Sequence, residues 1–112
     1  MIVTPSGEGQ SYVAALHHGC EAKRVQGGEV SPVTSFLMGI SNFAPGGGAD
    51  WDATNAEKVY LVLEGEITVE TENETVTLHE RDSVFLASNE RRRIVNESDA
   101  SCVLAVVIAP SA

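Results

Sequence analysis

Short apolar segments separated by turn-forming residues run along most of this chain. The clearest are residues 33–43, residues 59–63, which are apolar and rich in β-branched or aromatic side chains, and the apolar run 102–109. Runs of this length and composition are typical of β-strands, and no long helical period is present. The hydrophobic pattern therefore predicts an all-β chain.

Turn chemistry between these segments indicates how the strands connect. A Gly-rich corner at residues 45–48 follows the first segment, and residues 64–65 end the second. Residues 67–69 and 75–78 alternate around a polar turn at 72–74, which predicts a hairpin. With a further short strand at 84–87, this spacing predicts an antiparallel barrel or sandwich.

The first 30 residues are harder to assign. Residues 12–20 fit a strand or a short helical turn, because periodicity does not separate the two over so few positions. Gly27 and Gly28 predict a turn. We expect one domain, 1–112, with an N-terminal segment 1–30, a barrel core at about 31–110, and frayed residues 111–112.

Composition narrows the class of protein. Hydrophobic residues make up 43% of the chain and charged residues 21%. The sequence shows no secretory signal pattern and no apolar run of the roughly 20 residues that are needed to span a bilayer. We expect a cytoplasmic protein, in which Cys20 and Cys102 are reduced.

The charge balance excludes some partners. The net charge is −9, so the long-range field should repel nucleic acid and anionic membrane surfaces. Arg91, Arg92 and Arg93 are consecutive, and adjacent strand residues point to opposite faces. At least one of these arginines should therefore point inward.

Two glycines frame a motif that resembles one from the cupin superfamily. The family pattern G-x5-H-x-H-x3-4-E-x6-G fits from Gly46 to Gly65, but its histidines fall on Asp52 and Thr54 and its glutamate on Lys58. The specified positions of the second pattern, G-x5-P-x-G-x2-H-x3-N, fall on Arg81, Ala87, Asn89, Arg92 and Asn96. Of these, only Asn96 matches the pattern. The sequence EKVYLVLEGEITV also resembles the family's strand and turn.

This resemblance implies a cupin-type double-stranded β-helix, or jelly-roll barrel, with its functional pocket inside the barrel. It also implies a homodimer, because members of the family usually pair in this way. Cupins that bind a metal use histidines and a carboxylate. Lys58 and Arg92 have no free lone pair for a cation and would repel it, so we expect no metal at the usual site and no cofactor. Glu57, His79, His17 and His18 remain alternative metal ligands, although Glu57 should point outward if Lys58 points inward.

The replaced positions suggest a charged pocket. Asp52 could compensate one of the two cations, Lys58 and Arg92, and the remaining positive charge would favour an anion. Lys58 with a lowered pKa could act as general base or nucleophile, with Tyr60 as a proton donor and Arg92 binding a carboxylate or phosphate. The alternative is that both cations reach the barrel mouth and stay hydrated.

Other side chains complete the candidate site. Trp51, Thr54 and Asn96 are candidate ligand-binding residues, with packing the alternative for Trp51 and turn stabilisation for Asn96. Phenylalanines at 36, 43 and 85 are expected in the core.

Three functional classes fit these residues. The first is a metal-independent isomerase, cyclase or lyase that acts on a small anionic organic molecule, for which the catalytic candidates are Asp52, Lys58 and Tyr60. The second is a non-catalytic ligand-binding or sensing module. The third is a metal-dependent oxygenase or isomerase with unusual ligands.

Overall fold

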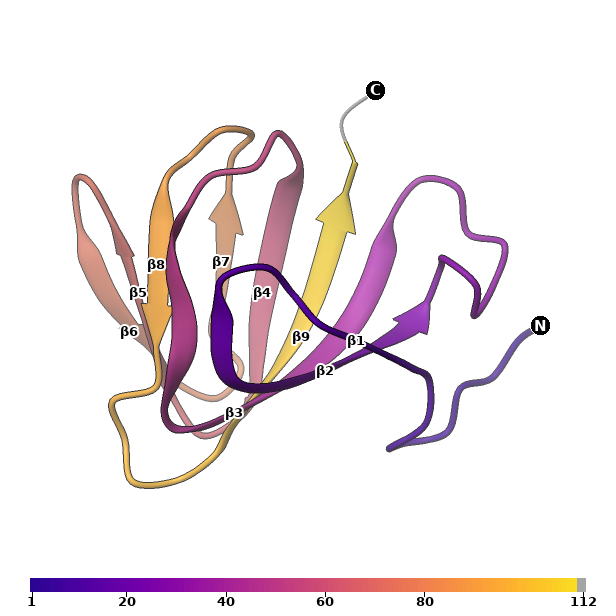
Figure 1. Ribbon diagram of the computed structural model, residues 1–112, viewed down its shortest axis with the longest axis horizontal. Helices are drawn as coiled ribbons and strands as arrows, with labels where there is room; N and C mark the ends of the chain where they lie inside the picture. Colours follow the sequence, from indigo (N-terminus) through magenta and orange to yellow (C-terminus); the bar gives the residue numbers. More distant parts are fainter. Residues whose placement is uncertain (111–112) are drawn as a thin grey trace.

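All secondary structure in the described part of the chain is β-strand, as the hydrophobic pattern predicts. The computed structural model describes residues 1–110, and its strands form one curved sheet (Figure 1). Within these residues no helix is long and apolar enough to cross a membrane. The strands are β1 (Gln10–Tyr12), β2 (His17–Gln26), β3 (Leu37–Asp52), β4 (Glu57–Glu64), β5 (Ile67–Thr71), β6 (Thr75–Leu78), β7 (Ser83–Leu86), β8 (Arg92–Val95) and β9 (Cys102–Ala109).

The strands form a nearly closed antiparallel barrel. Neighbouring strands follow the order β6-β5-β8-β3-β9-β4-β7, and every pairing is antiparallel. Strands β1 and β2 add to this barrel, because β2 pairs with β3 and β1 pairs with β2. The predicted antiparallel barrel is confirmed.

Strand β3 changes partners at the Gly-rich corner. Residues 37–43 pair with β9, whereas residues 48–52 pair with β8 (Figure 1). The backbone of β8 passes so close that a Cβ at Gly48 would collide with the carbonyl oxygen of Ile94. The corner predicted at 45–48 thus lies inside one long strand, which starts at Leu37 and not at residue 33.

Most of the other predicted elements are present. The polar turn at 72–74 joins β5 and β6 as a hairpin, and β9 has the predicted bounds. Residues 12–20 include the end of β1, a turn and the start of β2. The expectation that residues 111–112 fray lies outside the described residues.

The backbone supports the alignment of the two glycine-framed motifs. Four positions where the quoted patterns have glycine all adopt positive φ: Gly46 at 79°, Gly65 at 76°, Arg81 at 71° and Asn89 at 64°. Left-handed conformations are uncommon for residues other than glycine. The chain has therefore kept the turns of both patterns while replacing two of their glycines.

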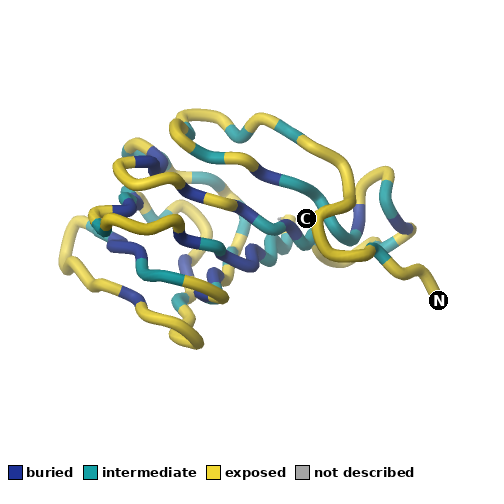
Figure 2. The backbone as a smooth tube through the Cα atoms, turned by 90° about the horizontal axis from the view of Figure 1, so that it is seen from below, coloured by how far each residue is buried: buried dark blue, intermediate teal, exposed yellow. Residues whose placement is uncertain are grey.

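The core fills the inside of the barrel, where buried segments face one another (Figure 2). Its largest fully buried side chains include Phe43, Ile67, Ile94 and Leu104. Phe36 and Phe85, expected in the core, are 41% and 56% exposed. Phe85 alternates with the buried Leu86 on β7 and so points outward, while Phe36 precedes β3.

Candidate functional site

A cavity of about 150 Å³ opens into the barrel between the inward faces of its strands and the N-terminal residues. Its lining combines an apolar floor with a few polar side chains, as is usual for small-molecule sites. The lining residues are Tyr12, Ala14, Ala15, His17, Ser41, Phe43, Asp52, Thr54, Lys58, Tyr60, Ile94, Leu104, Val106 and Ile108.

Four of the candidate residues from the sequence line this cavity together. Asp52 ends β3 and Thr54 follows it, while Lys58 and Tyr60 are two positions apart on β4 and so share its inward face. Glu57 is exposed, in keeping with its alternation with Lys58. It therefore does not reach the cavity.

Arg92 is the arginine of the triplet that points inward. It is 4% exposed, Arg91 is exposed, and Arg93 lies 3.5 Å from Glu70 at the surface. Arg92 does not line the cavity. Its Nη1 donates to the carbonyl oxygen of Asp50 at 3.2 Å, and its buried Nε has no hydrogen-bond partner among the described residues.

The charge of Arg92 nevertheless acts on the cavity. Burial lowers the pKa of Lys58, Arg92 lowers it further, and Asp52 partly offsets both. A lysine in this environment gives up its proton more readily than an exposed lysine. The half-buried Lys58 can thus bind an anion when protonated and accept a proton when neutral.

His17, which the sequence suggested only as an alternative metal ligand, also lines the cavity. Its ring stacks on Phe43 with the ring centroids 6.1 Å apart, while the neighbouring His18 is exposed. Tyr12 and His17 both come from the N-terminal region that the hydrophobic pattern left unassigned. Alternation within β2 was the available signal that only one histidine could face the barrel.

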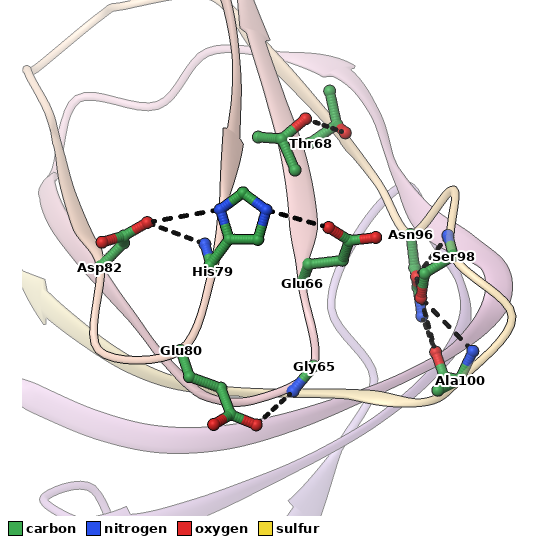
Figure 3. Close-up of polar contacts among 10 residues, drawn as sticks. Gly65, Glu66, Thr68, His79, Glu80, Asp82, Asn96, Ser98 and Ala100 are labelled. Atoms are coloured by element: carbon green, nitrogen blue, oxygen red, sulfur yellow. Dashed lines mark hydrogen bonds and ion pairs between the residues drawn. The ribbon is translucent and has the colours of Figure 1, made fainter.

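Besides Arg92, two further predicted ligand-binding residues lie outside the cavity lining, Trp51 and Asn96. The guanidinium of Arg91 lies over the ring of Trp51, 4.7 Å from its centroid. The buried amide of Asn96 donates to the carbonyl oxygen of Phe43. It also donates to the carbonyl oxygen of Ala100, and its oxygen accepts two hydrogen bonds from Ser98 (Figure 3). Asn96 therefore holds the turn between β8 and β9, which was the alternative role for this side chain.

The remaining metal-ligand candidate, His79, also lies outside the cavity lining. Its Nε2 is 3.3 Å from a carboxylate oxygen of Glu66, and its Nδ1 is 3.8 Å from Asp82 (Figure 3). The imidazole is 68% exposed, so this is a surface ion pair at most.

The residues present do not fit the metal of metal-binding cupins. The corresponding positions hold Asp52, Thr54, Lys58 and Arg92, and ammonium and guanidinium groups cannot coordinate a cation. Across residues 1–110 no group of three His, Cys, Asp or Glu side chains is arranged to hold a metal ion.

Comparison with known proteins gives a consistent picture. The family model described as Cupin domain matches residues 39–108. A relative named beta-D-galactosidase Rv1717 of Mycobacterium tuberculosis is 38% identical over 109 residues, covering 97% of this chain and 94% of that protein.

Solved structures share the fold. The polyketide cyclase RemF of Streptomyces resistomycificus superposes with a TM-score of 0.86 at 14% identity, covering 97% of this chain and 79% of that one. A predicted oxalate decarboxylase of Thermotoga maritima gives a TM-score of 0.82 at 20% identity, covering 99% and 100%. At these identities the similarity establishes the barrel architecture alone.

Proposed function

The chain belongs to the cupin domain family, and on this premise we propose that its barrel binds a small anionic organic molecule and isomerises, cyclises or cleaves it without a metal. Asp52, Lys58 and Tyr60 supply the acid–base chemistry, and Thr54 contacts the ligand. The reaction takes place in the cytoplasm.

The observation that carries this proposal is the positive charge in and beside the cavity. Lys58 lines the cavity and Arg92 is buried close enough to lower the pKa of Lys58. Asp52 is the single acidic residue of the lining, and its Oδ1 accepts a hydrogen bond from the backbone of Ala53. One carboxylate faces two cations, which favours an anionic ligand in a chain whose net charge is −9.

The division of roles follows from exposure and position. Arg92 is buried and bonded to a backbone carbonyl, so it attracts the anion through its charge and does not clamp it directly. Lys58 meets the anion, and its lowered pKa makes it a better proton donor than an exposed lysine. Tyr60 lies two positions after Lys58 on the same inward face, and we assign it the role of proton donor.

A binding or sensing module would use the same positive charge without turnover. Lys58→Met separates the two functions when binding and product formation are measured on the same protein. Product formation by the wild type that is lost in Lys58→Met supports an enzyme. Absence of turnover in the wild type, together with loss of binding in the variant, supports the module.

The first test is calorimetric titration of wild type and Lys58→Met with propionate, with Arg93→Met as the matched control. We expect at least tenfold weaker binding for Lys58→Met, because a charge-assisted hydrogen bond is lost, and no change for Arg93→Met. Wild-type protein that fails to bind propionate, or binding that is equal in all three proteins, would contradict the anion site.

Glycoside hydrolysis is a second candidate, favoured by the relative named a beta-D-galactosidase. Most glycosidases use two carboxyl groups across the scissile bond, whereas Asp52 is the one carboxylate in this cavity lining. Hydrolysis of 4-nitrophenyl β-D-galactopyranoside that is lost in Asp52→Asn would favour this function. Absence of hydrolysis in the wild type would exclude it for this substrate.

A further inference from the structure

His17 is held in one tautomer by a backbone carbonyl. Its Nδ1 lies 2.8 Å from the carbonyl oxygen of Ala15, in the turn before β2. A carbonyl oxygen can only accept a hydrogen bond, so Nδ1 must carry the proton. In the neutral ring, Nε2 is then left with a free lone pair.

The ring is also neutral at physiological pH. Burial lowers the pKa of His17, the bond to Ala15 partly opposes this, and the positive charges of Arg92 and Lys58 lower it again, with a smaller contribution from His18. Nε2 has no hydrogen-bond partner in the described part of the chain. His17 therefore provides the cavity with a hydrogen-bond acceptor that carries no charge.

The polar groups around the cavity impose two requirements on a ligand. Protonated Lys58 can only donate, so it requires an acceptor, which the proposed anion supplies. His17 at Nε2 can only accept, so it requires a donor such as a hydroxyl group. The floor beneath them is apolar, with Phe43, Ile94 and Leu104 in the lining.

We propose that Nε2 of His17 accepts a hydrogen bond from a ligand hydroxyl, and that the cavity therefore selects hydroxycarboxylates over simple carboxylates. This inference rests on the anionic site proposed above and adds the substrate class. His17 acts as a specificity-determining residue.

The cavity volume is compatible with a ligand of this class. A buried cavity of about 150 Å³ in another protein accommodates benzene, a molecule of about six heavy atoms. The volume of about 150 Å³ here thus suits a short hydroxy acid.

The test compares two acids that differ by one hydroxyl. Propionate and either enantiomer of lactate are titrated into wild type, His17→Phe and His18→Phe, with binding measured by calorimetry. Phenylalanine at position 17 keeps an aromatic ring against Phe43 but removes the acceptor, and His18 is the exposed neighbour that serves as control. Because lactate would gain one neutral hydrogen bond, we expect it to bind about fivefold more tightly than propionate to the wild type and to His18→Phe. We expect His17→Phe to bind the two acids with equal affinity.

Imidazole nitrogen NMR of the wild type gives a second readout that does not depend on the variant folding. The chain has three histidines, so the signals can be assigned by single substitutions. We expect His17 to be neutral with the proton on Nδ1 and its Nε2 signal to move with lactate more than with propionate.

The outcomes separate the two proposals. If propionate binding depends on Lys58 but lactate binds no more tightly than propionate, the role of His17 is overturned and the anion site stands. The same holds if the NMR signals show the proton of His17 on Nε2. Binding of neither acid would overturn both.

Discussion

Asp52 and Arg92 are cross-strand partners of β3 and β8, yet each makes its hydrogen bond to the backbone and not to the other. Asp52 bonds to the amide of Ala53, and Arg92 to the carbonyl of Asp50. A β-bulge between Ala49 and Asp52 separates the pair from regular register. Among residues 1–110 no carboxylate pairs with the buried guanidinium of Arg92, which is costly for stability and useful for attracting an anion.

Replacing Arg92 with methionine should raise stability and weaken anion binding. Exchanging a poorly paired buried charge for an apolar side chain of similar size is often stabilising, by about 1 kcal/mol or more. The carbonyl of Asp50 that loses its partner belongs to an exposed residue and can bond to water. Urea unfolding of wild type and Arg92→Met at neutral pH measures the change.

Arg93→Met is the control for this experiment. Arg93 is 42% exposed, and its pair with Glu70 is a surface contact, so its loss should change the free energy of unfolding by less than about 0.5 kcal/mol. A large loss of stability in Arg92→Met would mean that the guanidinium is fully compensated in the fold.

The neutral state of His17 predicts a pH dependence of stability. Its folded pKa lies below the ordinary value of 6.5, so the unfolded chain takes up the proton more readily. The free energy of unfolding should therefore fall as pH is lowered through about 6.5. Urea midpoints at pH 7.5 and 5.5 should differ less in His17→Phe than in the wild type.

His18→Phe serves as the comparison for this pH series, because both variants keep every carboxylate of the chain. It should retain the wild-type loss of stability on acidification. Equal losses in the two variants would show that His17 is already hydrated and titrates like a surface histidine.

Arg81→Gly should stabilise the protein. Arg81 has a φ of 71°, where glycine is free of the strain that a Cβ introduces. Because glycine also costs unfolded-state entropy, the net gain should be about 0.5–1 kcal/mol. Thermal unfolding measures it, and a lower melting temperature for Arg81→Gly would show that the arginine side chain has a stabilising contact.

Much of the fold could be predicted from residue patterns, because the turns and the strand alternation are encoded by residues that are close together in the sequence. The hairpin turn at 72–74 and the alternation of Lys58 and Tyr60 depend on neighbouring residues, and both are present. The path of β3 could not be predicted in this way. Glycines that resemble a turn in sequence serve here to let β8 and the backbone of β2 at Gly19 approach the strand closely.

The site was predictable where a residue's position on a strand determines its direction. The family motif placed Asp52 and Lys58 in the cavity. The strand rule placed Tyr60 on the same face as Lys58 and Glu57 on the opposite face. It could not place Trp51, which follows a change of register in β3 and packs with Arg91, or reveal His17, whose strand had no clear periodicity. Contacts between the N-terminal residues and the barrel mouth are long-range, and no local pattern encodes them.

The two cysteines should remain thiols even under mild oxidation. Cys20 and Cys102 flank Phe43 on opposite sides, since both are its cross-strand partners. Two strand spacings separate them by about 9–10 Å, beyond the reach of a disulfide. Burial raises the pKa of Cys102 to about 11, so this thiol should react with Ellman's reagent only after unfolding. Two rapidly reacting thiols in the native protein would contradict this packing.

The outer face of the barrel leads to a last prediction, that the protein forms a homodimer. Phe85 is 56% exposed and Val59 is 40% exposed, and they are cross-strand neighbours that continue through Val107 on β9. Two copies that each carry a net charge of −9 repel one another, so their contact should be made by uncharged side chains. The apolar row of Phe85, Val59 and Val107 is therefore the surface that we expect a second copy to cover. Sedimentation velocity should show a dimer for the wild type and a monomer for Phe85→Glu, because the substitution would bury two like charges against each other. A wild-type monomer at about 100 µM, or a Phe85→Glu dimer, would mean that this face is not the interface.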